Sequence, residues 1–271
     1  MVELALGFSP EFARGHVPAI CFDLAPELAG LGASPIADVQ HGLVAGQLQE
    51  AYAWCAERFP LLIRDADMNP IPAICEIHAA QRSNLGEYLT ASSSRRPYRI
   101  FVAAPWPLSS VYRLGSLLAH EAIHQALYNR ERIASVARPW SLAYSPWKQR
   151  LRPGRLVWHA AWTFSTQFAL LCDAVLNDGE AMLAADPDIL GFIAEMEARI
   201  VRCIESLETF EILGPEEANG IAGALAETAW LACNLAARHA DYAVLRSQWS
   251  ESVAREIQTW SESGCARIEI A

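Results

Sequence analysis

The stretch LLAHEAIHQALYNRE, residues 117–131, contains the pattern His-Glu-Ala-Ile-His. Residues four positions apart lie on the same face of an α-helix, so His120 and His124 can direct two imidazoles at one metal ion. Glu121 lies about 100° around the helix from His120, and we expect it beside the ion as a general base or an outer hydrogen-bond partner. The pattern predicts a metal centre. The alternative is a pair of core histidines, because leucines flank them on the same face.

A third ligand must come from elsewhere, because Leu127 and Arg130 occupy the positions where the longer metzincin motif carries Gly and His. The preferred candidate is His159, which stands near the start of a predicted helix, RLVWHAAWTF. A carboxylate further along the chain, Asp173 or Glu180, is the alternative. The other histidines, expected to be packing or surface residues, are His16, His41, His78 and His239.

The elements that must position these residues are predicted to be mainly helical. Apolar residues at helical spacing, with prolines and glycines as boundaries, predict helices at 40–59, 111–130, 154–177, 187–213 and 215–247, followed by a shorter helical tail. Two β-like runs, 71–79 and 99–105, are separated by a polar loop. We therefore expect a mainly α fold: a single helical domain over residues 1–271, with a small two- or three-stranded β element preceding the HExxH helix.

Composition narrows the class of protein. A chain of 271 residues with 52% hydrophobic residues can bury a sizeable core. The net charge of −10 argues against nucleic-acid binding, which depends on clustered cations. We expect no secretory signal and no stretch long enough to span a bilayer, hence no membrane partner. The seven cysteines are scattered and lack CxxC spacing, so we expect reduced thiols in a cytoplasmic protein.

After the HExxH block comes the segment AYSPWKQRLRPGRLVWHAAWTF, residues 143–164, which contains His159. Together with LLAHEAIHQ it resembles the HExxH-motif α-ketoglutarate-dependent peptide β-hydroxylases found beside natural-product gene clusters. That family couples the HExxH helix to a Ser-Pro-Trp-basic segment, an Arg-Pro pair and a His that enters a helix. The resemblance covers about residues 97 to 170. The matching positions are His120, Glu121, His124, Ser145, Pro146, Trp147, Lys148, Arg152, Pro153 and His159.

The resemblance implies iron(II), α-ketoglutarate as cosubstrate, and dioxygen. His120, His124 and His159 would hold the iron and leave coordination positions for the cosubstrate and dioxygen. The far carboxylate of α-ketoglutarate needs a cation, for which Arg152 is preferred over Arg155 and Lys148. Lys148 departs from the family, where Arg is more frequent. The implied substrate and partner is a ribosomally made precursor peptide, hydroxylated at a β-carbon.

Two other functions stay open at this point. In a zinc metallopeptidase or a relative of one, Zn(II) would acidify a water and Glu121 would accept its proton. HExxH alone points to this class. In a helical peptide-binding or structural protein, the motif would be a vestige. Neither the hydroxylated residue nor the oligomeric state can be read from the sequence.

Overall fold

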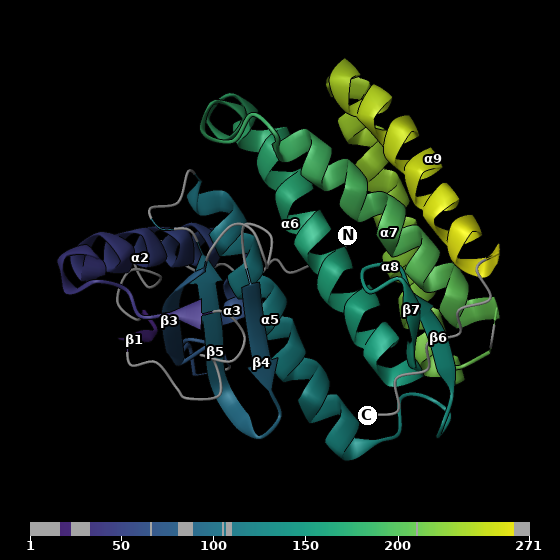
Figure 1. Cartoon of the computed structure of the whole chain (residues 1–271), viewed down its shortest axis with the longest axis horizontal. Coiled ribbons are helices and arrows are strands. Elements are labelled where there is room, and N and C mark those ends of the chain that lie inside the picture. The colour runs from purple at the N-terminus through teal and green to yellow at the C-terminus, as the bar shows by residue number, and fades with distance from the viewer. Residues whose placement is uncertain are drawn as a thin grey trace. The chain divides into compact units, whose positions relative to one another are not determined.

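The structure is a computed structural model, which describes residues 17–22, 33–65, 67–80, 89–104, 106, 110–209 and 211–262 (Figure 1). Contacts between Cα atoms divide the chain into two compact units, Met1–Gln125 and Ala126–Ala271. The boundary falls inside one continuous helix, α5 (Val111–Ile133). The HExxH block therefore belongs to the first unit and His159 to the second, and the single-domain organisation stays a prediction.

The first unit combines helices with a mixed β-sheet. Its helical elements are the 3-10 helix η2 (Asp38–Gln40), α2 (His41–Arg58), α3 (Pro60–Ile63) and the first part of α5. The strands are β1 (Ala19–Cys21), β2 (Ala33–Ser34), β3 (Ile74–Ala80), β4 (Leu89–Ser93) and β5 (Arg96–Ala104). Their order is β1-β3-β5-β4, with β2 paired to β3. β1, β3 and β5 are parallel, whereas β2 and β4 run antiparallel to their partners.

One face of this sheet is closely packed. Residues with at most 1% exposure on this face include Cys75, Ile77, Ile100, Val102 and Ala104. Thr90 and Ser92 of β4 are the register partners of Val102 and Ile100, so their side chains share this face. Tyr52 of α2 and Glu121 of α5 both interact with residues of this face, which places the two helices over it.

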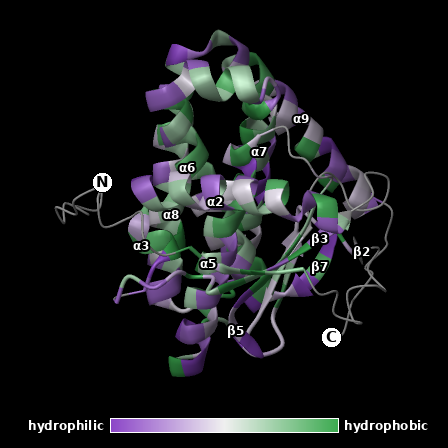
Figure 2. Ribbon diagram, turned by 90° about the vertical axis from the view of Figure 1, so that its left-hand side faces the viewer, coloured by the Kyte–Doolittle hydropathy of each residue, from purple (hydrophilic) through white to green (hydrophobic). Residues whose placement is uncertain are grey.

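The second unit is a β-hairpin followed by four long helices. The hairpin pairs β6 (Leu142–Ser145) with β7 (Arg150–Pro153). The helices are α6 (Gly154–Ala185), α7 (Ile189–Thr209), α8 (Pro215–Arg238) and α9 (Ala240–Glu262), which run alongside one another in Figure 1. α6 contacts α7 and α8, and α7 also contacts α9. Hydrophobic residues predominate along α6 and α7 (Figure 2), where the core of this unit lies.

The mainly α prediction is confirmed, and several helix boundaries agree closely with the sequence pattern. The helix expected to end at residue 177 continues to Ala185 after a non-helical residue, Asp178. The helix expected to run to 247 instead ends at Arg238, and α9 begins at Ala240. The main difference is in the β-structure, because the sheet has five described strands instead of two or three. β4 lies partly in the segment predicted as a polar loop, since hydroxyl side chains hid its alternation.

The six described cysteines are free, in agreement with the expectation of reduced thiols, and Cys265 lies outside the described residues. Within the described residues, α8 is long and apolar enough to cross a membrane by length and composition alone, which the sequence analysis did not expect. Core helices pass the same test, and α8 packs against α6, α7 and α9. No membrane span is therefore assigned.

In the first unit, α5 and α2 approach each other closely at Gly115. A Cβ atom at Gly115 would lie 2.5 Å from Cε3 of Trp54 and 2.9 Å from the carbonyl oxygen of Ala51. Trp54 is held in place by an edge-to-face contact with Tyr112 of α5, with ring centroids 5.4 Å apart. The absence of a side chain at Gly115 therefore permits the α2–α5 contact that fixes the helix bearing HExxH.

We expect Gly115→Ala to lower the free energy of unfolding by about 1–3 kcal/mol, because the added methyl group must displace an indole and a backbone carbonyl. Gly46→Ala in α2 is the matched control. Nothing lies within 4 Å of a Cβ there, so this change should raise the free energy of unfolding by about 0.5–1 kcal/mol through helix propensity. Urea denaturation followed by circular dichroism measures both, and equal stability of the two variants would contradict the packing argument.

Candidate metal centre

The two histidines of the HExxH block lie side by side on α5. Their ring centroids are 4.9 Å apart and the ring planes meet at 69°. His120 is 7% exposed and His124 is half-buried. A helix brings residues four apart to one face without help from the rest of the fold, so α5 alone pairs these two imidazoles. Two of the three predicted ligands are thus adjacent.

Glu121 is directed toward the sheet of the first unit. It is 2% exposed, and the side chains of Ser92 and Thr90 on β4 interact with its carboxylate. Burial raises the pKa of Glu121 to about 7, although both hydroxyl side chains act to lower it. A carboxyl group with a pKa near neutrality can accept and release a proton, as the sequence analysis required of a general base.

The helix is also tied to the neighbouring strand just after the HExxH block. Tyr98 of β5 adopts a positive φ of 61°, and its backbone N–H donates a hydrogen bond of 3.2 Å to Oε1 of Gln125. Gln125 is 5% exposed. This bond and the Gly115 contact hold α5 on both sides of His120 and His124 within the first unit.

His159 is buried in the second unit, on the second turn of α6. It is 2% exposed, and its Nε2 lies 3.2 Å from Oε1 of Glu131. Its ring also lies 5.0 Å from the ring of Tyr128, measured between centroids. Both partners belong to α5, where they lie four and seven positions after His124 in the sequence. At helical spacing, Tyr128 and Glu131 continue the face of α5 that bears the two histidines.

The Ser-Pro-Trp segment is the end of β6 and the turn of the hairpin, and it is anchored to the helices of the second unit. Trp147 stacks on Phe164 of α6, with centroids 3.9 Å apart and planes within 8°. Nη1 of Arg199 on α7 donates a hydrogen bond of 2.7 Å to the carbonyl oxygen of Pro146. The Arg-Pro pair then leads into α6, where a Cβ at Gly154 would lie 2.5 Å from Ile212. Close packing thus fixes both the hairpin and the start of the helix that carries His159.

The three candidate cations differ in their surroundings. Lys148 is exposed in the turn between β6 and β7. Arg155 is 55% exposed, and its Nη1 lies 3.7 Å from Oε2 of Glu131. Arg152 is half-buried on β7 and is the register partner of Ala143. Of the three, Arg152 is the one that is partly buried.

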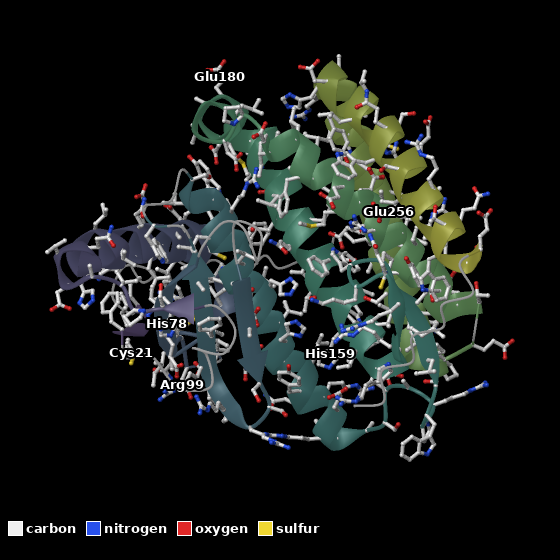
Figure 3. All side chains as sticks on the ribbon, viewed as in Figure 1. Cys21, His78, Arg99, His159, Glu180 and Glu256 are labelled. Atoms are coloured by element: carbon white, nitrogen blue, oxygen red, sulfur yellow. The ribbon has the colours of Figure 1, made fainter. Side chains whose placement is uncertain are left out.

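The alternative carboxylate ligands are less suitably placed. Asp173 is half-buried in α6, and Glu180 is exposed beyond the kink at Asp178. His159 and Glu180 lie toward opposite ends of α6 (Figure 3), about 30 Å apart at the rise of a helix. Neither carboxylate has the burial of His159.

Most of the remaining histidines have structural surroundings, as predicted. His78 on β3 is fully buried against Phe101, and burial lowers its pKa. His41 stacks on Phe22 and contacts the carbonyl oxygen of Ile36 through Nε2. His239 caps the C-terminus of α8. His16 lies outside the described residues.

No group of three or more His, Cys, Asp or Glu side chains that could hold a metal ion is present among the described residues. The ligand set of His120, His124 and His159 therefore stays a prediction. Glu131 was not singled out from the sequence. The available signal was its position, seven residues after His124 on the same helix face.

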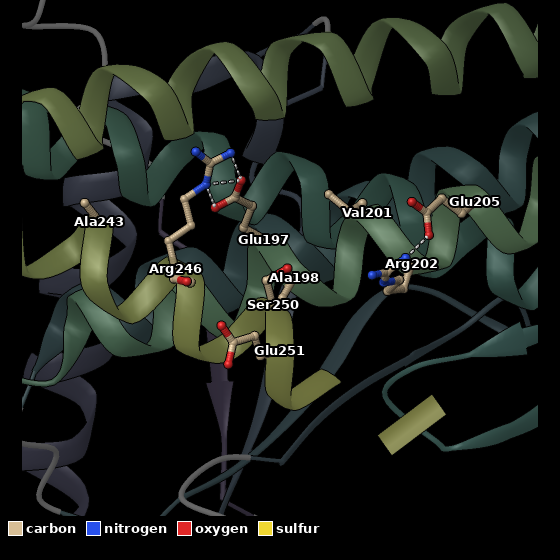
Figure 4. Close-up of a pocket in the computed structure, with 10 residues that line it drawn as sticks. Glu197, Ala198, Val201, Arg202, Glu205, Ala243, Arg246, Ser250 and Glu251 are labelled. Atoms are coloured by element: carbon tan, nitrogen blue, oxygen red, sulfur yellow. Dashed lines mark hydrogen bonds and ion pairs between the residues drawn. The ribbon is translucent and has the colours of Figure 1, made fainter. Parts of the chain in front are cut away.

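A separate groove of about 480 Å³ lies between α7 and α9 (Figure 4). Its floor contains Glu197, which is 5% exposed and accepts a hydrogen bond from the hydroxyl of Tyr242 at 2.8 Å. Arg246 also binds Glu197, with an N–O distance of 2.8 Å. These three residues satisfy one another and join α9 to α7, so the groove is explained by helix packing.

Comparison with known proteins finds no family model that matches this chain and no curated protein with significant similarity to it.

The burial of Glu121 predicts a pH-dependent stability of the metal-free protein. Glu121 is neutral in both states below about pH 4.5; above this, the unfolded chain ionises while the folded carboxyl stays protonated up to about pH 7. Its contribution to folding is therefore lost as pH rises through this window, by up to about 3 kcal/mol.

Glu121→Gln removes the titrating group, so the stability difference between variant and wild type should shift by about 3 kcal/mol in favour of the variant between about pH 4 and about pH 8. Urea titrations of chelator-treated protein measure this shift. Ala53→Gln, at an exposed position in α2, is the control for adding an amide side chain. Parallel pH profiles for the wild type and Glu121→Gln would show that this carboxyl ionises normally.

Proposed function

We propose that this chain is an iron(II)- and α-ketoglutarate-dependent oxygenase that hydroxylates the β-carbon of a residue in a ribosomally made precursor peptide. The observation that carries the proposal is the common helix face. α5 bears His120 and His124 side by side, and further along the same helix Tyr128 and Glu131 contact the buried His159. A simple core pair of histidines would not require a third buried imidazole beside this helix.

The chemical types of the three proposed ligands fit iron(II). Imidazole nitrogen binds Fe(II) well, and three such ligands leave positions for a bidentate 2-oxo acid and for dioxygen. When bound, iron(II) with α-ketoglutarate and dioxygen would supply the oxidant for C–H hydroxylation. The chain itself would bind the metal through its three histidines and orient the cosubstrate. The Trp147–Phe164 stack keeps the hairpin that carries Arg152 against α6.

Arg152 is the proposed anchor for the far carboxylate of α-ketoglutarate. A guanidinium forms two parallel hydrogen bonds with a carboxylate, which fixes orientation as well as position. Lys148 is exposed and Arg155 already faces Glu131, so these two are second choices. Glu121 would serve as an acceptor for a proton or as a hydrogen-bond partner next to the metal.

A zinc metallopeptidase is the second candidate, and one observation favours it. Glu121 follows His120 on α5, and burial raises the pKa of its carboxyl group to about 7, where it can accept a proton. In a peptidase this carboxylate would take the proton of a metal-activated water that attacks a peptide carbonyl. The two candidate functions use His120, His124 and Glu121 alike, so they are distinguished by which metal binds and by whether α-ketoglutarate is required.

We expect anaerobic addition of Fe(II) and α-ketoglutarate to the wild-type protein to produce a weak visible charge-transfer band. His120→Ala, His124→Ala and His159→Ala should each abolish the band, because each removes one proposed ligand. His239→Ala, at the end of α8, is the control and should leave the band unchanged. Tight zinc binding without a band, together with peptide cleavage, would establish the peptidase instead. With a band, mass spectrometry of a co-expressed precursor peptide should show the gain of one oxygen.

Arg152→Gln should raise the α-ketoglutarate concentration needed for half-maximal band intensity by roughly 10- to 100-fold, since hydrogen bonds to charged groups contribute about 1.5–3 kcal/mol. Iron binding without cosubstrate should change little. Lys148→Gln, in the neighbouring turn, is the matched control and should have no effect. If Arg152→Gln behaves like this control, the anchor is another cation.

A further inference from the structure

The strand β4 forms one border of the sheet in the first unit. In the order β1-β3-β5-β4, it pairs only with β5 among the described strands. Every second residue of such an edge strand directs its backbone N–H and C=O groups away from the sheet, where another extended chain can bind them. The sequence of β4, LTASS, has neither a proline nor a charged residue, which are usual means of blocking an edge. Its backbone is therefore suited to pairing with a further strand.

The side chains of β4 are small. Ala91 is exposed, and Thr90 and Ser92 are half-buried. Short side chains of this kind cover little of the adjacent backbone. The register with β5 becomes irregular between Ser92 and Ser93, so the regular edge is the stretch Leu89–Ser92.

The helix α5 lies over the half of the sheet that ends in β4, and α2 lies over the other half. Glu121 of α5 interacts with Thr90 and Ser92 of β4, whereas Tyr52 of α2 interacts with Cys75 of β3. Figure 1 shows the same order, with α2 near β1 and β3 and with β4 at the opposite border of the sheet. The side of α5 that faces away from α2 is therefore the side toward the β4 edge.

The two histidines of the HExxH block lie on that side of α5. Successive residues are separated by about 100° around a helix, so Gly115 lies about 120° from Glu121, on the side where it contacts α2. His120 and His124 lie about 100° and about 60° from Glu121 in the opposite direction. Glu121 itself faces the sheet. Both imidazoles thus belong to the face of α5 that lies toward the β4 edge.

We propose that the edge of β4 binds the substrate peptide as an added β-strand, which places the peptide beside the histidines of the HExxH block. This inference rests on the proposed function, because it takes a precursor peptide as the substrate. Main-chain hydrogen bonds to β4 give affinity that depends little on the peptide's sequence. The added strand lies about 4.8 Å from β4, and its side chains point alternately toward α5 and away from it. Every second residue of the peptide therefore directs its β-carbon toward α5.

A peptide fits this edge better than a second copy of this chain does. Pairing over Leu89–Ser92 alone buries far less than the roughly 1,200 Å² of a stable protein interface. The opposite border of the sheet is less suitable for the peptide. Its strand β1 is only Ala19–Cys21 and lies on the side of α2, away from the HExxH histidines.

The test uses the full-length, chelator-treated protein, with a phage-displayed library of random dodecapeptides as the probe. Peptides selected on the wild type are synthesised, and their affinities are measured by fluorescence anisotropy. Replacing single backbone N–H groups of the peptide by N-methyl should weaken binding about 3- to 10-fold at every second position of the paired stretch, the usual effect of losing one hydrogen bond. The intervening N–H groups point away from β4, so their replacement should have little effect.

Thr90→Pro and Ala91→Pro form a matched pair of protein variants. Neighbouring residues of an antiparallel strand direct their N–H groups in opposite directions, so one substitution removes a bond to β5 and the other removes an outward N–H. The variant that loses the outward N–H should fold with nearly wild-type stability in urea denaturation, because edge strands tolerate proline there. It should bind the peptide about 3- to 10-fold more weakly. The other variant should lose stability.

Four results would overturn the inference: no peptide is selected, N-methyl groups have no effect, they weaken binding at consecutive positions, or the well-folded proline variant binds like the wild type. A wild type that elutes as a dimer in gel filtration, and as a monomer in that variant, would assign the edge to a second copy instead. Failure of the proposed oxygenase is seen separately. Peptide binding by the chelator-treated protein requires no metal, whereas a missing band with Fe(II) and α-ketoglutarate concerns only the chemistry.

Discussion

The burial of polar side chains on α5 is the constraint on which the rest of the structure depends. His120, Glu121 and Gln125 are all at most 7% exposed, on a helix that would bury leucine or alanine in an ordinary core. A buried polar group without a partner costs about 1–3 kcal/mol, so each of these residues requires specific neighbours. The hydroxyl side chains of β4 and the backbone N–H of Tyr98 meet part of this requirement in the first unit, whereas Oε2 of Glu121 and Nε2 of Gln125 are buried without a hydrogen-bond partner among the described residues. The sheet therefore also supplies polar partners, because Thr90 and Ser92 of its edge strand β4 interact with the buried carboxyl group of Glu121.

In the second unit, His159 is another buried polar side chain that requires specific neighbours. An imidazole buried to 2% exposure at the start of a helix needs both a polar partner and a rigid backbone. The carboxylate of Glu131 lies 3.2 Å from Nε2 of His159, and the hairpin with its Trp147–Phe164 stack fixes the backbone where the chain enters α6. The Ser-Pro-Trp and Arg-Pro segments thus have a structural explanation. They set the position at which α6 begins, and this determines which residues of its first turns face α5.

The sequence was informative where local patterns decide the structure. Pro60, Pro153 and Pro215 mark helix boundaries, and the spacing of His120 and His124 requires no tertiary information. The sequence was uninformative where an element depends on residues that are distant in the chain. β4 consists of small and hydroxyl residues that alternate between faces, a pattern that also describes a loop. The β6–β7 hairpin lacks the usual glycine turn, and its turn residue Gln149 adopts a positive φ of 50° instead.

The contact between Glu131 and His159 could not be recognised from sequence, because the two residues lie 28 positions apart. In the linear pattern Glu131 is an ordinary acidic residue near the polar end of a helix. Only the contact between α5 and α6 in the second unit reveals that its carboxylate is partly buried, where burial raises its pKa and Arg155 lowers it. Spacing along one helix can therefore suggest candidate ligands, whereas a contact between residues of two helices is found only from the structure.

Charge balance connects the proposed ligand set with the proposed cosubstrate. Three neutral imidazoles leave the full double positive charge of a divalent ion uncompensated, whereas a carboxylate ligand would halve it. α-Ketoglutarate carries two carboxylates, one suited to the metal and one to a guanidinium such as Arg152. A dianion would therefore compensate two of the three positive charges that a divalent ion on three histidines and an arginine carry together, whereas a neutral peptide carbonyl compensates none. In a chain with a net charge of −10, local positive charge of this kind would come from a divalent ion held by the histidines of α5 and α6, together with Arg152 of β7.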